Sequence, residues 1–185
     1  MNPLILKAGL LLSFAWAVSY AYDHLAARRA ARREREELFA QLAALPPVKA
    51  DFATPEGAIL CLENACRRRD IEAAAACRDF ETEARLWLQE RGQLSKHIKD
   101  DHLPEIIRTT ERAFRDSLAK NWPVDLEPVR SYFPKREPYR NGIVLVSEVT
   151  QKADGSLFKQ QVLVTETGKG WRVVTHLPNN PDKEI

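Results

Sequence analysis

Residues 54–80 read TPEGAILCLENACRRRDIEAAAACRDF, and they carry the strongest local signals in this chain of 185 residues. The Thr54 hydroxyl can cap a helix, and Pro55 suits the first helical position, where no amide hydrogen is needed. Small and apolar residues then recur every three to four positions, which predicts one buried face. Asp70 starts a second short helix, Ile71–Cys77. The solvent face of the first helix would consist of charged residues, namely Glu56, Glu63, Arg67 and Arg68.

Two more helices are expected after this stretch, because the helical period of apolar residues continues. The first, Glu81–Gln89, would bury Ala84, Trp87 and Leu88. The second is Leu103–Asn121, and its buried face would consist of the residues at helical spacing: Ile106, Ile107, Thr110, Phe114 and Leu118.

Beyond residue 122 the period of the apolar residues changes to two, which predicts strands. A first strand, Val124–Phe133, would end at Pro134 and lead into a loop at 135–141. Three later strands should form an antiparallel meander, because Asp154-Gly155 favours a hairpin turn: Ile143–Thr150, Leu157–Thr165 and Trp171–Leu177. Helices followed by such a meander indicate an α+β fold, with the helices packed on a curved antiparallel sheet.

In the order and spacing of these elements the chain resembles the nuclear-transport-factor-2-like (NTF2-like) superfamily of cone-shaped α+β domains. Residues 54–80 are similar to the opening helix pair of that superfamily, and GKGWRVVTHL at 168–177 is similar to its closing strand. The resemblance covers Thr54 to about Leu177, and it implies that Trp171 turns into the core. Through the branch of bacterial immunity proteins, it also implies a protein partner. No catalytic residue of the superfamily matches a position in this sequence.

An apolar run at residues 3–22, broken by Lys7, precedes all of this. Twenty helical residues at about 1.5 Å each just cover a hydrocarbon core of about 30 Å, so residues 1–22 are predicted to be a transmembrane anchor. The alternative is a cleaved signal peptide, although Ser19-Tyr20-Ala21 makes a poor cleavage site.

Residues 23–53 are predicted to form a helical stalk rich in arginine and alanine, followed by a proline linker. The positive-inside rule then places the domain, residues 54–178, in the cytoplasm of a single-pass protein of the inner (cell) membrane, before a tail at 179–185. A periplasmic or secreted location is the alternative. The membrane-flanking charges are five arginines: Arg28, Arg29, Arg32, Arg33 and Arg35.

Composition excludes some classes of function. Basic and acidic residues are equal in number across residues 48–185, so a nucleic-acid-binding domain is not expected. The cysteines Cys61, Cys66 and Cys77 are odd in number and give no disulfide framework; we interpret them as small buried residues. The segment from His97 to His102 is interpreted as a polar loop, so neither a metal nor a cofactor is predicted.

Three residues are candidates for a cavity or an interface. Glu148 interrupts an apolar strand, and a carboxylate on the concave face would lose solvation, as a general base requires. Tyr132 and Tyr139 could line a cavity mouth or a protein interface. His176 is expected to face solvent or helix ends. No nucleophile elbow, phosphate loop or paired-carboxylate motif is present, so no catalytic residue and no reaction are assigned.

Three functions from different classes remain. The first is a membrane-tethered module that binds a protein through its open sheet face and the loops around 132–139, and in its narrowest form neutralises a toxin. The second is a small-ligand-binding protein or enzyme that uses the cavity of the cone. The third is a homo-oligomeric structural module, such as a homodimer, of an envelope complex.

Overall fold

The computed structural model describes residues 24, 27–30, 32–90, 102–121 and 128–177, and the chain divides after Pro46 into two compact units. The predicted membrane anchor, the polar loop at 97–101 and the tail at 179–185 lie outside the described residues. No helix within the described ranges is both long and apolar enough to cross a bilayer.

The described part of the first unit is helical, including residues 32–43. Arg32 pairs with Glu36 at 2.8 Å, one helical turn away, and the Arg35 guanidinium lies 5.5 Å from the centre of the Phe39 ring. All five arginines of the predicted stalk are exposed. Their role beside a membrane stays a prediction.

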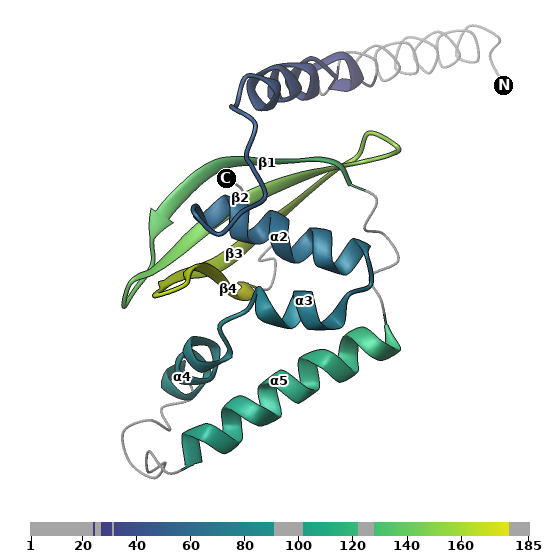
Figure 1. The fold of residues 1–185 in the computed structure, drawn as a ribbon. Helices are drawn as coiled ribbons and strands as arrows, with labels where there is room; N and C mark the ends of the chain where they lie inside the picture. Colours follow the sequence, from purple (N-terminus) through teal and green to yellow (C-terminus); the bar gives the residue numbers. More distant parts are fainter. Residues whose placement is uncertain (1–23, 25–26, 31, 91–101, 122–127, 178–185) are drawn as a thin grey trace, which may run out of the picture. The chain divides into compact units, whose positions relative to one another are not determined.

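The described part of the second unit consists of helices followed by strands, which confirms the predicted α+β class (Figure 1). The sheet is antiparallel, with strand order β1-β2-β3-β4, so the predicted meander is also confirmed. In chain order the elements are α2 (Pro55–Arg67), α3 (Ile71–Ala76), α4 (Phe80–Glu90), α5 (Leu103–Lys120), β1 (Pro128–Pro138), β2 (Ile143–Lys152), β3 (Leu157–Thr167) and β4 (Gly170–Leu177).

The helix starts follow the capping residues that the sequence indicates. The Thr54 hydroxyl accepts a hydrogen bond from the Gly57 amide at 3.0 Å, and Pro55 occupies the first turn of α2. The Asp70 carboxylate accepts from the Ala73 amide at 2.9 Å at the start of α3. Local sequence therefore determines where these two helices begin.

Backbone hydrogen bonds at both of its ends attach the α2–α3 pair to the edge strand β4. Before α2, the Phe52 carbonyl accepts from the Trp171 amide at 2.9 Å. After α3, the Cys77 carbonyl accepts from the Val173 amide, also at 2.9 Å. The ends of the helix pair are thereby tied to one strand, while the turn between α2 and α3 makes neither of these bonds.

Side chains on the two sides of the sheet form separate clusters, because successive residues of a strand alternate in direction. On the α2-facing side, Ile59, Leu62 and Ala65 of α2 pack with strand residues that include Val146 and Val162. On the opposite side, Leu86 of α4 packs with Ile143, Leu145, Leu163 and Val174. These strand residues are at most 8% exposed, so the open sheet face expected from the sequence is not exposed in this region.

The first strand ends later than predicted, and its predicted start at 124–127 lies outside the described residues. Instead of ending at Pro134, β1 continues to Pro138, so 135–138 belong to the strand and not to a loop. The pairing of β1 with β2 shifts between Tyr132 and Lys135, which places Pro134 in the irregularity. A proline is tolerated there because the residue needs no amide hydrogen for the ladder.

Two helices bury different residues than expected. In α4, Trp87 is 44% exposed while Leu86 is buried, because α4 packs against both β4 and α5 and Leu86 faces the sheet. In α5, only Leu118 of the predicted face is fully buried. The reason is that α5 packs on α3 and α4 and not on the sheet (Figure 1).

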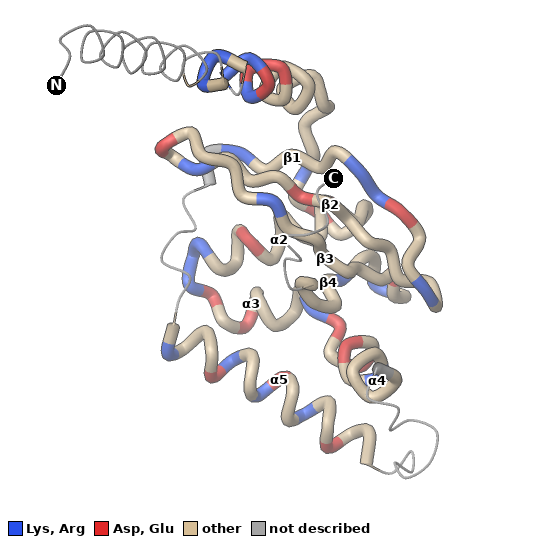
Figure 2. The backbone as a smooth tube through the Cα atoms, turned by 180° about the vertical axis from the view of Figure 1, so that it is seen from behind, with Lys and Arg blue, Asp and Glu red and all other residues tan. Residues whose placement is uncertain are grey.

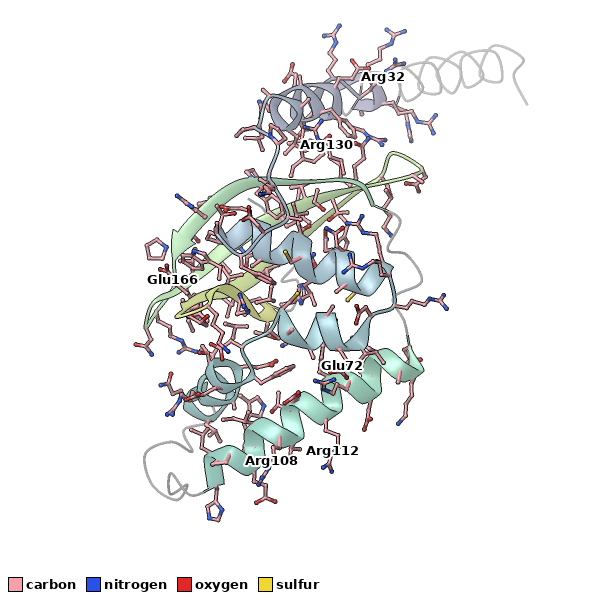
Figure 3. All side chains as sticks on the ribbon, viewed as in Figure 1. Arg32, Glu72, Arg108, Arg112, Arg130 and Glu166 are labelled. Atoms are coloured by element: carbon pink, nitrogen blue, oxygen red, sulfur yellow. The ribbon has the colours of Figure 1, made fainter. Side chains whose placement is uncertain are left out.

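Charged side chains reinforce the outer helix and are mixed in sign. Arg115 of α5 forms an ion pair with Glu72 of α3. Glu72 is labelled in Figure 3. Basic and acidic residues are interspersed along α5 in Figure 2. This mixed charge agrees with the balanced composition of the domain.

We predict that Gly57→Ala destabilises the protein, although alanine normally favours a helix. A Cβ at this position would lie 2.5 Å from the Asp51 carbonyl oxygen and 2.7 Å from that of Lys49, so the backbone must move. The expected loss is about 1–3 kcal/mol in urea unfolding of the full-length protein in detergent. Gly168→Ala is the matched control, because a Cβ there meets nothing within 4 Å. Equal stability of the two variants would contradict the prediction.

Candidate functional site

Polar side chains from α2 and from all four strands gather on the α2-facing side of the sheet. The register brings them together: Glu148 is opposite Gln160 on the neighbouring strand, and His176 is opposite Val162. Ser131 is likewise opposite Thr150, two residues along from Glu148. We call this group the polar cluster; its members are Glu63, Ser131, Glu148, Thr150, Gln160 and His176.

Glu148 is the buried centre of the polar cluster, with no exposed surface. One carboxylate oxygen accepts a hydrogen bond from the Gln160 amide nitrogen at 2.8 Å, and the other accepts from the Thr150 hydroxyl at 3.3 Å. Both donors lie on strands, and the sheet therefore fixes the direction of the carboxylate.

Glu63 brings a second carboxyl group to Glu148 from α2. Its side chain is 12% exposed and accepts a hydrogen bond from the Ser131 hydroxyl at 3.3 Å, close enough to Glu148 for the two carboxyl groups to interact. Burial and the charge of Glu148 raise the pKa of Glu63 from 4.5 to about 8, and the Arg67 guanidinium opposes this shift. At neutral pH the Glu63 carboxyl group therefore keeps its proton.

His176 lies at the rim of the polar cluster, where its side chain remains accessible to solvent. The surrounding protein and the positive charge of Arg78 lower the pKa of His176, while Glu148 acts in the opposite direction. The imidazole is therefore neutral at pH 7, with one nitrogen able to donate and the other able to accept.

Arg78 supplies a fixed positive charge near the cluster. Its guanidinium is 9% exposed, pairs with Glu83 at 2.6 Å and donates to the Val174 carbonyl at 2.5 Å. It also lies 4.7 Å from the centre of the Phe114 ring. These contacts join the α3–α4 connection to β4 and α5, so Arg78 serves the fold and acts on the cluster through its charge.

The polar cluster offers carboxyl, amide, hydroxyl and imidazole groups in one place. Both hydrogen-bond donors and acceptors are therefore present, and the Glu148 carboxylate at their centre is bonded within the cluster. A protonated carboxyl beside a second carboxyl is also a pattern that can serve proton transfer. Across the described part of the chain, no group of three or more His, Cys, Asp or Glu residues is arranged to hold a metal ion.

The structure separates the three residues that the sequence singled out. Glu148 lies in the polar cluster, but Tyr132 pairs with Val149 and so belongs to the opposite side of the sheet. Tyr132 is 6% exposed, and its hydroxyl donates to Gln151 at 3.3 Å. Tyr139 follows β1 at the β1–β2 turn and is 38% exposed. They do not form one site.

Sequence reasoning missed Glu63 and Gln160. Glu63 was assigned to the solvent face of α2, yet it lies four residues after the buried Ile59, at the edge of the apolar stripe. Gln160 alternates with Val162 along β3, so period two could have placed it on the α2-facing side. His176 also shares this side with Val162, although it is solvent-accessible as expected.

Comparisons with known proteins give limited information. No family model matches the chain, and a search of curated proteins finds no match. A solved structure described as an NTF2-like transpeptidase from Campylobacter jejuni is similar, with a TM-score of 0.37 and 10% sequence identity. That similarity covers 65% of this chain and 97% of the other, and it is too low to indicate a function.

We predict that Gln160→Leu destabilises the protein by about 1–3 kcal/mol, because the buried Glu148 loses its closest hydrogen-bond donor. Urea unfolding of the full-length protein measures this. The control is Gln161→Leu, the same change at the next residue, which lies on the opposite side of the sheet. If both variants unfold at the same urea concentration as the native chain, the hydrogen bond to Glu148 contributes nothing.

Proposed function

We propose that residues 54–178 form an NTF2-like binding domain that takes a small polar molecule at the polar cluster, and that residues 1–22 anchor it in a membrane. The order of helices and strands and the antiparallel meander support the fold assignment. The polar cluster supports the proposal of a bound ligand. The apolar run at 3–22 and the arginines after it support the proposal of a membrane anchor.

The proposal rests on the pair of carboxyl groups formed by Glu63 of α2 and Glu148 of β2. Two carboxyl groups buried side by side contribute poorly to stability, because desolvation and mutual repulsion both oppose them. Apolar residues in the same places would extend the neighbouring core of Val146 and Val162. A ligand that uses these groups accounts for their presence.

We predict that full-length protein from its native membranes carries a small molecule, which native mass spectrometry would detect as added mass. Glu148→Gln removes the buried charge, so the variant should lose most of this ligand. Glu166→Gln is the matched control, since Glu166 is exposed near the β3–β4 turn (Figure 3).

The result that would contradict a ligand site at the polar cluster has two parts. The native protein would carry no bound molecule, and a panel of small amines, carboxylic acids and polyols would raise the melting temperatures of native protein and Glu148→Gln equally. Either finding on its own would weaken the proposal, and both together would exclude a ligand of these classes at the cluster.

We predict a cytoplasmic domain, because Arg28, Arg29, Arg32, Arg33 and Arg35 follow the apolar run. A fluorescent reporter that folds only in the cytoplasm should be active when fused after residue 185. A periplasmic phosphatase at the same position should be inactive. The reverse pattern would favour the periplasmic or secreted alternative.

A protein partner is the second candidate, and the turn after β1 favours it. Tyr139 is 38% exposed, and the Arg140 guanidinium lies 5.1 Å from the centre of its ring. Tyrosine and arginine are enriched in protein interfaces, and here Tyr139 is exposed while Arg140 is half-buried beside it. Toxin neutralisation is the narrower form of this candidate, and only the resemblance in sequence supports it.

Affinity purification of the full-length protein in mild detergent distinguishes these partners. A protein recovered with the native chain but not with Tyr139→Ala would favour the second candidate, and its toxicity on its own would favour immunity. Recovery of only a second copy of the chain would favour the homo-oligomeric alternative.

A further inference from the structure

The α2 helix is attached to the sheet by different contacts along its length. Its N-terminal end follows the backbone bond between Phe52 and Trp171, and Gly57 packs closely on Lys49 and Asp51. Near its C-terminal end, Glu63 makes the polar contact with the sheet, through Ser131 and Glu148. The turn that follows precedes α3, whose C-terminal end is tied to β4 by backbone hydrogen bonds of Cys77 and Asp79 with Val173.

We propose that Glu63 and Glu148 form a proton-operated latch between α2 and the sheet, closed while the two carboxyl groups share a proton and released when that proton leaves. Without the proton, two buried carboxylates would be in direct contact, and their repulsion would be large because little water screens them. The C-terminal turns of α2, which no backbone hydrogen bond ties to the sheet, would then move away from β2 against the packing of Leu62 and Ala65.

The neighbouring arginines, Arg67 and Arg78, offset little of the repulsion between the two carboxylates. The Arg67 guanidinium is 3.9 Å from Glu63, but its side chain is 40% exposed, so solvent screens the attraction. Arg78 is held by Glu83 and by the Val174 carbonyl. Among the described residues, the titratable or charged groups around the two carboxyls are Cys66 and Arg67 from α2, Arg78 from the α3–α4 connection and His176 from β4.

The direction of the pH effect follows from the shift at Glu63. Its pKa is raised from 4.5 to about 8 in the folded protein, so the folded state keeps a proton that the unfolded state has lost between these values. The stabilising contribution is complete below pH 4.5, falls through this range and is lost above pH 8. The latch is therefore closed at and below neutral pH, and alkaline pH releases it.

This proposal goes beyond the proposed ligand site, because the latch operates without any ligand. If a ligand does bind the polar cluster, release of α2 would change access to it, and only that consequence depends on the proposed function. The ligand site and the latch can be contradicted independently. If no molecule is bound, the latch is not contradicted, and if α2 does not move with pH, the ligand site is not contradicted.

Hydrogen exchange in the full-length protein in detergent tests the latch. Exchange of α2 amides, corrected for the intrinsic effect of pH, should accelerate about tenfold for each pH unit between about 4.5 and 8 and level off above pH 8, relative to the amides of α5 in the same molecule. Glu63→Gln retains a donor for Glu148 but carries no charge, so its α2 should exchange at the same corrected rate at pH 6 and pH 9. Glu166→Gln should behave like the native chain.

Two results would overturn the latch. One is a constant ratio of α2 to α5 exchange from pH 6 to pH 9 in the native protein. The other is an unchanged acceleration between pH 6 and pH 8 in Glu63→Gln. If that variant does not fold, Glu148→Gln provides the same test from the strand side, and the pH series on the native protein stands on its own.

Discussion

The packing of α2 on the sheet is the contact on which the rest of the second unit depends. Ile59, Leu62 and Ala65 of this helix close one side of the core against β2, β3 and β4. The chain before α2 and the chain after α3 both bond to β4, so the helix pair also covers an edge strand that would otherwise expose unpaired backbone groups. Gly57 permits this approach, because no side chain separates α2 from the carbonyls of Lys49 and Asp51.

The same contact creates the polar cluster. Where the apolar stripe of α2 ends, Glu63 enters the region under the helix and meets Glu148 from the central strand β2. Hydrogen bonds from Gln160 and Thr150 hold the strand carboxylate in place, so the sheet fixes its part of the site, and α2 supplies the part that the proposed latch would move. Ligand recognition and the response to pH would then use the same two side chains.

Local signals in the sequence were sufficient for much of the fold. The caps at Thr54 and Asp70, the Asp154-Gly155 turn and the alternation along β2 and β3 act over a few residues, and the structure agrees with each. Tertiary contacts decided the rest. Pro134 could remain inside β1 because of an irregular pairing with β2, and Trp87 is exposed because α4 packs on two sides. The polar cluster depends on strand register and on the position of α2, so the sequence indicated Glu148 but not its partner Glu63.

The central claim is that Glu63 and Glu148 share a proton at neutral pH. Infrared difference spectroscopy with isotope-labelled glutamate, comparing the full-length protein with Glu63→Gln, measures this most directly. The account predicts the carbonyl band of a buried protonated carboxyl group in the native protein at pH 7, lost above pH 8 and absent from the variant. A native protein with no such band at pH 7 would contradict it, because both carboxyl groups would then be ionised in direct contact.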